Sequence, residues 1–173
     1  CVACGHPSDS WAHAILGCTH EAIRGAITNR HNAVVLALAR GLTRGKLAKW
    51  LVLVDAGKSD GDPVRPTIPD WMLDGVAAKP DIVIVEGWPY TAAPPTRPVR
   101  RRGHVTVRIH VVEVTCTTER LIPRRREQKA AKYAPVVRAL RAAGWNASQT
   151  VHTIAMGVRG GVQSDILQVL ETL

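Results

Sequence analysis

The sequence predicts a single α/β domain with a small N-terminal appendage, and three observations lead to this fold class. The chain has 173 residues, of which 46% are hydrophobic, and this is enough to bury one core. Helix-like and strand-like segments follow one another in the order helix, three strands, helix, strand, helix. Three of the four cysteines lie within the first eighteen residues, outside this pattern of helices and strands.

The chain is strongly basic. Lys and Arg outnumber Asp and Glu by 23 to 14, which gives a net charge of +9 and a pI near 10.0. This charge favours a polyanionic partner, with nucleic acid as the first candidate, because binding releases condensed counterions. No apolar run approaches the about 20 residues that a membrane-spanning helix needs, so no membrane partner is expected. Residue 1 is a cysteine that already belongs to a motif, so we expect a piece of a longer polypeptide.

Residues 1–20 carry the ligand pattern of a zinc site. The spacing C-x2-C-x8-H-x4-C is formed by Cys1, Cys4, His13 and Cys18. A tight C-x2-C knuckle offers two thiolates, and a following short helix offers a third thiolate and an imidazole to complete a tetrahedron. His6 and His20 are alternative ligands, and His20 could replace His13. We expect a closed, structural zinc site.

A helix is predicted over residues 19–42. Its apolar stripe consists of Ile23, Ile27, Val34 and Leu38. His31 lies four residues after Ile27 and three before Val34, so its side chain should point inward, most simply as a hydrogen-bonded core histidine. A buried strand over residues 50–55 follows. Residues 57–79 are rich in Gly, Pro and Asp and are expected to be irregular.

Two further strands are predicted on either side of a long basic loop. The β-branched residues at 82–85 predict the first of them. Residues 87–103 carry four prolines and four arginines, so they can form neither a central strand nor a regular helix. The arginines lie close to two aromatic residues, a combination that suits the phosphates and bases of nucleic acid. These residues are Arg97, Arg100, Arg101 and Arg102, with Trp88 and Tyr90.

The second of these strands, over residues 104–115, places a carboxylate on an apolar face. Alternate side chains share one side of a strand, so Glu113 falls on the same face as Ile109 and Val111. If the two strands are antiparallel neighbours whose paired numbers sum to about 194, Asp81 lies beside Glu113. Two such carboxylates repel each other unless a cation lies between them. Oxygen ligands of this kind suit Mg²⁺ or Mn²⁺.

The last third of the chain is expected to form a helix, a strand and a helix. The helix over residues 124–143 ends at Gly144, and Pro135 should kink it or mark a break one turn upstream. Residues 149–158 predict a strand, and apolar residues at helical spacing predict a final helix. Cys116, which precedes these elements, is most simply a small buried hydrophobe.

The helix over residues 124–143 also brings amines toward the carboxylates. Lys129 and Lys132 share one face of this helix, with Tyr133 beside them. A lysine near a metal-bound phosphate can stabilise developing charge or orient the attacking water, while the metal lowers the pKa of that water. These residues together predict the hydrolysis of phosphodiester bonds.

The same pieces, in this order, resemble the restriction-like endonuclease domain, with its preceding zinc knuckle, at the C-terminal end of site-specific non-LTR retrotransposon proteins. The matching pieces are the C-x2-C-x8-H-x4-C knuckle, "RHN" at 30–32, "KPD" at 79–81, the strand with Glu113 and "KAAKY" at 129–133. They span almost the whole chain. The resemblance implies a zinc knuckle over residues 1–20. Over residues 21–173 it implies a PD-(D/E)XK restriction-endonuclease-like core, which is a mixed central sheet flanked by helices.

The resemblance also implies an activity. In the nucleus, a domain of this kind nicks target DNA so that the reverse transcriptase domain of the same polypeptide can prime from the exposed 3′ end, and element RNA is a further partner. Asp81 and Glu113 resemble the metal-binding carboxylates of the family. Lys129, Lys132 and Tyr133 are similar to its helical lysines and their neighbour. Arg30 and His31 are similar to its first nuclease motif, with Arg30 expected to bind DNA.

Two departures from the family pattern leave alternatives open. The general nuclease pattern has a lysine two residues after the second acid, where this chain has Thr115, and the helical lysines would replace it. The second acid is Glu113 where much of the family carries Asp, and the basic loop lengthens the gap from Asp81, so Glu86 competes for this position. A second hypothesis is an inactive zinc-knuckle module that only binds target DNA or template RNA. A third is a cellular, resolvase-like nuclease.

Overall fold

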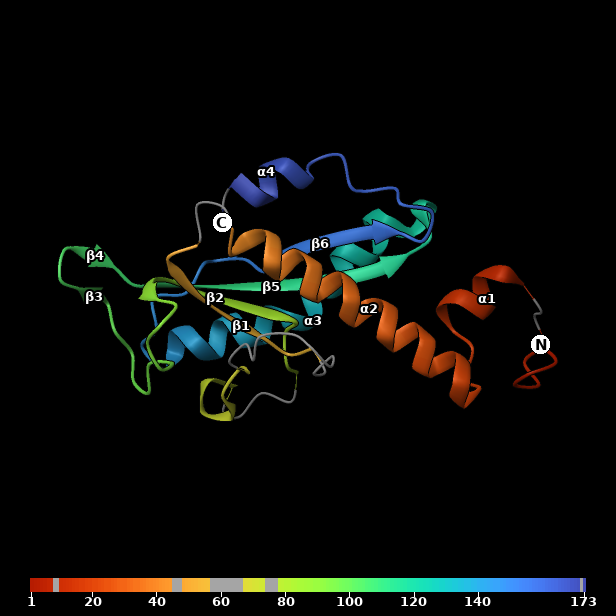
Figure 1. Ribbon diagram of the computed structural model, residues 1–173, viewed down its shortest axis with the longest axis horizontal. Helices are drawn as coiled ribbons and strands as arrows, with labels where there is room; N and C mark the ends of the chain where they lie inside the picture. Colours follow the sequence, from red (N-terminus) through yellow and green to blue (C-terminus); the bar gives the residue numbers. More distant parts are fainter. Residues whose placement is uncertain (8–9, 45–47, 57–66, 74–77, 172) are drawn as a thin grey trace.

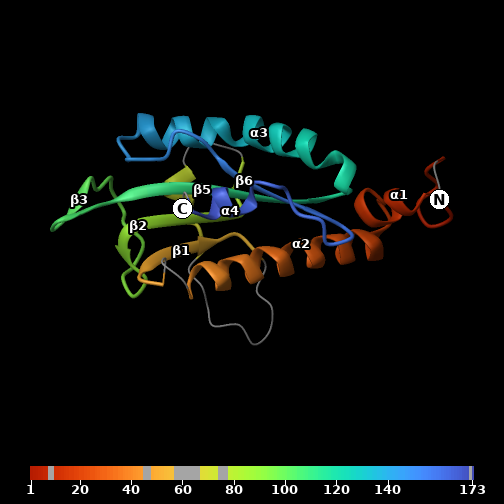
Figure 2. The same cartoon turned by 90° about the horizontal axis from the view of Figure 1, so that it is seen from above.

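The computed structural model describes residues 1–7, 10–44, 48–56, 67–73, 78–171 and 173. The helices are α1 (Trp11–Leu16), α2 (Glu21–Leu42), α3 (Ile122–Ala142) and α4 (Ile166–Glu171), with short 3-10 helices η1 (Asp70–Leu73) and η2 (Glu119–Leu121). The strands are β1 (Trp50–Val54), β2 (Ile82–Pro89), β3 (Arg101–Arg102), β4 (Val105–Thr106), β5 (Arg108–Thr117) and β6 (His152–Gly157). The predicted α/β class is confirmed: a mixed sheet lies between helices, and α1 lies at one end of the molecule (Figures 1 and 2).

The sheet has the strand order β1-β2-β5-β6. The pairs β1/β2 and β2/β5 are antiparallel, whereas β5 and β6 are parallel and are joined through α3, the long connection that a parallel pair requires. Within β2 and β5, Ile82 pairs with Val112 and Glu86 with Arg108. The predicted register is therefore confirmed. It brings Asp81, which directly precedes β2, level with Glu113.

Two hydrophobic cores cover the two faces of the sheet. On one face, α3 packs on the odd-numbered residues of β2 and β5, such as Val83 and Ile109. On the other face, α2 and α4 pack on even-numbered residues such as Ile84 and Val112. The strands are apolar on both faces because helices cover both, as expected for a central sheet of an α/β protein.

The face that α2 turns to the sheet differs from the predicted stripe. The fully buried residues of α2 are Val35 and Ala39, not Val34 and Leu38, which are only partly buried. His31 lies one turn before Val35 on the same line of the helix. The line of α2 that faces the sheet therefore lies one residue away from the predicted one, and it includes His31, which lies beside Asp81 at the start of β2.

Of the two predicted effects of Pro135, a kink or a break one turn upstream, the break is wrong. Helix α3 continues without interruption from Ile122 to Ala142 (Figure 1). Both Pro135 and Ala131, whose carbonyl loses its partner at a proline four residues later, lie on the exposed side of the helix. Water can therefore satisfy this carbonyl, while the opposite side packs on the sheet.

The basic loop holds a short hairpin that the sequence did not predict. The single strand predicted over residues 104–115 is divided, with β4 pairing with β3 in a separate small sheet before β5 begins. Gly87 permits this arrangement because its φ is +79° and a Cβ atom there would lie 2.6 Å from the carbonyl oxygen of Thr106. The hairpin projects from the end of the molecule opposite α1 (Figures 1 and 2).

Two predicted segments are described only in part. Of residues 57–79, the structure describes 67–73 and 78–79, which include η1, and the remainder lies outside the described residues. Within the described ranges, none of the helices combines the length and the apolar character that crossing a bilayer demands.

Candidate functional site

Asp81 and Glu113 lie side by side where the β2/β5 pair ends. The backbone N–H of Asp81 donates to Glu113 Oε2 at 3.3 Å, and the N–H of Val114 donates to Asp81 Oδ2 at 2.7 Å. These reciprocal bonds follow from the register, because each carboxylate lies next to the backbone of the other strand. The Glu113 side chain is fully buried and that of Asp81 is 14% exposed, so both are held in a largely desolvated position.

Two cationic residues from the two helical layers complete this cluster. His31 Nε2, from α2, lies 3.0 Å from Asp81 Oδ1. Lys129 Nζ, from α3, donates to Glu113 Oε1. The site thus combines one group from each of α2, the start of β2, β5 and α3. With His31 protonated, two negative and two positive charges balance.

The surroundings shift the pKa values of two of these groups. Burial, followed by the neighbouring charge of Asp81, raises the pKa of Glu113 to about 7, although Lys129 opposes this shift. The hydrogen bond with Asp81, followed by one with Cys116, raises the pKa of His31 to about 9. A buried carboxyl group that titrates near neutral pH beside a second acid is typical of functional sites.

Tyr133 and Lys132 lie beside the cluster. The Tyr133 ring is buried in the core under α3, and Lys129 Nζ lies 5.5 Å from its centroid. Burial, and then the charges of Glu113 and Asp81, raise the pKa of the Tyr133 phenol far above its usual value, so the phenol remains a hydrogen-bond donor. Lys132 is exposed, and its Nζ lies 3.4 Å from the Tyr133 hydroxyl. The structure therefore brings Lys129 directly to the carboxylates, and Lys132 contacts the tyrosine instead.

Glu86, the competitor for the second acid, lies elsewhere. It is near the other end of β2, paired with Arg108, and its Oε2 is 2.9 Å from His110 Nε2. His110 in turn lies 3.3 Å from His152 Nε2. Glu86 therefore belongs to a separate polar group on the α2 side of the sheet, and it is Glu113 that meets Asp81.

Arg30 does not join the carboxylates, and Cys116 departs from its predicted environment. The Arg30 guanidinium donates to the carbonyl oxygen of Ile15 at 2.9 Å, so it links α2 to α1 and points away from the carboxylates. Residues next to each other on a helix point about 100° apart, which is why Arg30 and His31 serve different neighbours. Cys116 is only half-buried and hydrogen-bonds to His31, so it is not a simple core residue.

Asp55 is a carboxylate near this site that sequence reasoning missed. It directly follows β1, and its backbone N–H donates to the Asp81 carbonyl at 2.9 Å. Its charge contributes to the raised pKa of Tyr133. In the sequence, Asp55 is an acid at the end of a short apolar strand. This position predicts a place near Asp81 only once β1 is known to pair with β2.

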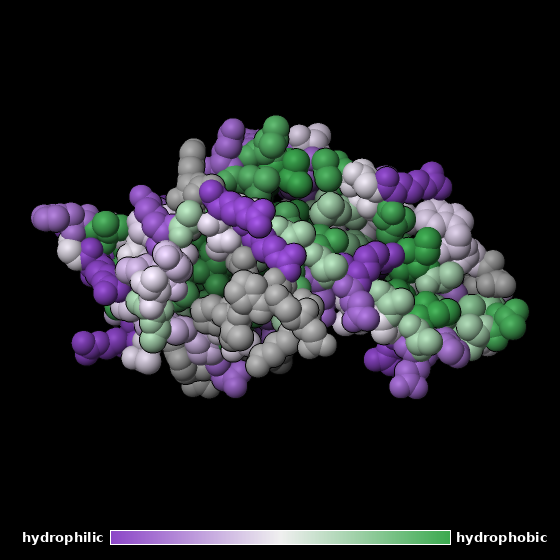
Figure 3. All heavy atoms as spheres, in the orientation of Figure 1, coloured by the Kyte–Doolittle hydropathy of each residue, from purple (hydrophilic) through white to green (hydrophobic). Residues whose placement is uncertain are grey.

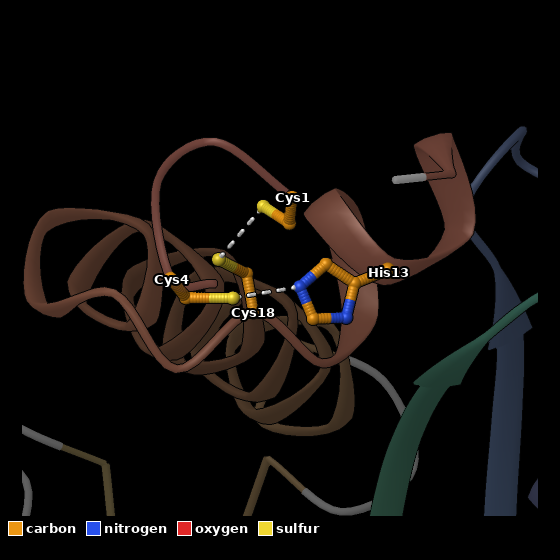
Figure 4. A group of neighbouring side chains, drawn as sticks. All are labelled: Cys1, Cys4, His13 and Cys18. Atoms are coloured by element: carbon orange, nitrogen blue, oxygen red, sulfur yellow. Dashed lines mark hydrogen bonds between the residues drawn. The ribbon is translucent and has the colours of Figure 1, made fainter. Parts of the chain in front are cut away.

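The predicted zinc ligands form a second cluster at the N-terminus (Figure 4). The ligand atoms of Cys1, Cys4, His13 and Cys18 all lie within 4.8 Å of one another. Cys1 Sγ is 3.9 Å from Cys18 Sγ, close to the about 3.8 Å that zinc–sulfur bonds of 2.3 Å give at a tetrahedral angle. These four residues could hold a zinc ion.

The geometry selects His13 over the two alternative histidines. Ser10 caps α1 by accepting from the His13 N–H, and this short helix presents the His13 ring to Cys4 Sγ, which is 3.1 Å from Nε2. His6 stacks on the His13 ring, with centroids 4.5 Å apart, and His20 is the N-cap of α2. Hydrogen bonding at the His6 backbone lowers the pKa of the Cys4 thiol to about 6, which favours the thiolate that zinc binds.

The aromatic residues of the basic loop differ in accessibility. The Arg102 guanidinium lies 4.5 Å from the centre of the Trp88 ring, and the indole N–H donates to the Ala93 carbonyl. Trp88 is therefore already stacked against an arginine of its own chain. Tyr90 is 63% exposed, and Arg97 is exposed as well, so these two side chains are accessible to a ligand.

Comparison of the chain with protein-family models, with curated proteins and with solved structures gives no significant match. The chemistry of the site therefore rests on the residues and their geometry.

The raised pKa of His31 predicts a pH-dependent stability. Because the folded protein binds this proton more tightly than the unfolded chain does, the stabilisation is complete below pH 6.5 and is lost as the pH rises through about 9. In urea unfolding without added magnesium, we expect the wild type to lose about 2 kcal/mol across this window. His31→Gln should remove most of this loss, and the exposed His104→Gln should keep it. An unchanged pH slope in His31→Gln would contradict the ion pair.

Proposed function

We propose that this chain is the restriction-like endonuclease domain, with its zinc knuckle, of a non-LTR retrotransposon protein, and that it nicks target DNA with a divalent metal ion. The observation that carries the proposal is the convergence of Asp81 and Glu113 with Lys129 and His31. The order of α2, three sheet strands, α3 and β6 supports a PD-(D/E)XK core, as does the position of the two acids, just before β2 and on β5, the two central strands.

The donor set fits a hard cation. Asp81 and Glu113 would hold Mg²⁺ or Mn²⁺, since both ions prefer carboxylate oxygens. Burial and the repulsion from Asp81 disfavour the charged form of Glu113 and raise its pKa. The positive charge of a bound cation would offset both effects. When bound, such an ion supplies Lewis-acid stabilisation of the phosphate and a more acidic water.

The residues of the chain have distinct tasks in this proposal. The His31 ring and the Val114 N–H hold the two oxygens of Asp81 in one orientation. Lys129, which contacts Glu113, would stabilise negative charge that develops on a phosphate or orient the attacking water. The Tyr133 ring contacts the Lys129 ammonium group, and its phenol is a hydrogen-bond donor beside the carboxylates. Lys132 adds a second positive charge at the surface.

The basic surface supplies affinity for DNA in this proposal. Exposed Arg97 and Tyr90 suit phosphate and base contacts, and the net charge of +9 favours binding that weakens with salt. In the cell the domain would act in the nucleus on target DNA, beside the reverse transcriptase domain of the same polypeptide and the element RNA.

A binding-only module is the second candidate, and one observation favours it. All four oxygens of Asp81 and Glu113 are already engaged, by His31, Val114, Lys129 and the Asp81 backbone. A site that is balanced without metal could serve only to stabilise the fold. In that case the same basic surface would bind target DNA or template RNA without cutting it.

A plasmid-nicking assay separates the two candidates. Supercoiled plasmid is incubated with the unmutated protein and with Asp81→Ala, in Mg²⁺, in Mn²⁺ and with EDTA. We expect nicking by the unmutated protein in either metal, none with EDTA, and none by Asp81→Ala, whose salt-sensitive DNA binding should remain nearly unchanged. DNA binding without nicking by the unmutated protein would instead favour the module.

A further inference from the structure

A basic hollow lies between the β3–β4 hairpin and the C-terminal end of α3. Three arginines from two separate elements line it, together with polar residues of the hairpin and of the loop after α3. These residues are Arg100, Arg101, Thr106, Arg141 and Asn146. Figures 1 and 2 show the hairpin and this end of α3 at the same end of the molecule, and strongly hydrophilic side chains project there in Figure 3.

The walls of this hollow are held by backbone hydrogen bonds. Ile109 N–H donates to the Asn146 carbonyl at 2.8 Å, and the Asn146 side-chain amide donates to the Val107 carbonyl at 3.1 Å. Val107 N–H donates to the Arg100 carbonyl at 3.1 Å. The loop after α3, the hairpin and the start of β5 therefore form one connected frame, so the hollow does not depend on side-chain contacts alone.

The electrostatics of the hollow favour an anion. No acidic side chain is among its lining residues, and within the described part of the chain none of its three arginines forms an ion pair. The C-terminus of α3 carries a partial negative charge, which opposes an anion. This effect is reduced because the carbonyls of Ala139, Leu140 and Arg141 already accept N–H groups from residues 143–145. Three full positive charges outweigh what remains.

The distance from the carboxylates to the hollow follows from α3, because Lys129 contacts Glu113 and Arg141 lines the hollow. Lys129 and Arg141 are twelve residues apart on α3, which corresponds to about 18 Å at the rise of a helix. Successive phosphates of one strand of B-DNA advance by about 3.4 Å along the axis. The hollow is therefore about five base pairs away from the carboxylates.

We propose that this hollow binds a backbone phosphate of the DNA about five base pairs from the nicked bond, and so sets the length of duplex that the enzyme needs on one side of the cut. The inference rests on the proposed nuclease function for its distance, whereas the phosphate site itself does not need catalysis. Guanidinium groups in a fork geometry bind phosphate oxygens in pairs, which suits a fixed anchor better than a diffuse positive surface.

The test combines a shortened substrate with paired variants. On duplexes with a mapped nick, each flank is shortened in turn while kcat/KM is measured. For the wild type we expect a loss of about tenfold when one flank falls below about five base pairs. The double variant Arg100→Ala/Arg141→Ala should already be about tenfold slower on the long duplex and should not respond further. The control Arg138→Ala, on the same helix but outside the hollow, should respond as the wild type does.

Binding measurements keep the test independent of nicking. Without catalytic metal, the double variant should bind duplex DNA more weakly than Arg138→Ala does, and its slope of log K against log salt should be smaller by about two. If the wild type does not nick but this difference is present, the nuclease function fails and the phosphate site stands. Equal losses in Arg138→Ala and the double variant, a length response that survives in the double variant, or a loss confined to single-stranded RNA would overturn the proposal.

Discussion

Glu113→Gln is expected to lower the rate of metal-dependent nicking by about a thousandfold or more, because the metal-supported stabilisation of a phosphoryl transition state is worth several kcal/mol. The substitution keeps the shape of the side chain and removes only its charge. Glu113 is fully buried beside Asp81, and β5, all of whose residues are described, carries no second acid that could replace it. Single-turnover nicking of a supercoiled plasmid in Mg²⁺ measures this effect.

Glu86→Gln is the matched control for this prediction. Glu86 is the acid that sequence reasoning left as a competitor, and the structure pairs it with His110 near the far end of β2. Its replacement should leave nicking within about threefold of the wild type, and thermal unfolding should show that both variants are folded. Nicking that survives in Glu113→Gln but is lost in Glu86→Gln would reverse the assignment of the second acid.

Replacement of Cys18, one of the four residues that could hold zinc, is expected to have the second large effect, the unfolding of the N-terminal module. Helix α1 has no buried residue, and among the described residues up to Cys18 that cysteine is the only one that is buried. A module without an apolar core depends on its metal, and structural zinc contributes about 10–16 kcal/mol in small zinc-binding peptides. Cys18→Ser should therefore lose one zinc ion per chain and the amide protection of residues 10–18.

The body of the protein should survive this loss. The sheet, α2 and α3 have their own two cores, and α1 is joined to them through contacts such as the Arg30 hydrogen bond to Ile15 and the Arg159 contact with Trp11. Zinc content by atomic absorption, together with hydrogen exchange, measures both parts. Cys116→Ser, outside the cluster, should retain its zinc. A Cys18→Ser variant that keeps zinc, or that loses protection throughout the sheet, would contradict this division.

Local patterns predicted the two acids on neighbouring strands and the N-terminal cysteine–histidine cluster. Strand alternation placed Glu113 on one face, and the antiparallel register placed Asp81 level with it, as the pairing of Ile82 with Val112 confirms. The C-x2-C-x8-H-x4-C spacing likewise anticipated a cluster that forms within one short segment. In the first case the period of the strands relates the residues, and in the second the ligands lie within one short segment of the chain.

Contacts between distant segments could not be read in this way. His31 reaches Asp81 across 50 positions of the chain because the sheet selects the line of α2 that includes Val35. Arg30, its neighbour in the same short motif, serves α1 instead. The proximity of Asp55 to the site likewise depends on β1 lying beside β2. Each of these contacts depends on which surfaces pack together. The periodicity of a single helix or strand does not predict that packing.

The amino-acid sequence by itself therefore determined the α/β class and the cluster of Cys1, Cys4, His13 and Cys18, and it placed the two acids together once an antiparallel register was assumed. Only the tertiary structure decided which cations meet those acids, that Glu86 lies apart from them, and that Arg141 joins the arginines of the hairpin in one hollow. The physical reason is that hydrogen-bonded repeats are local properties of the chain. The pairing of helices with a sheet is settled by the packing of whole surfaces.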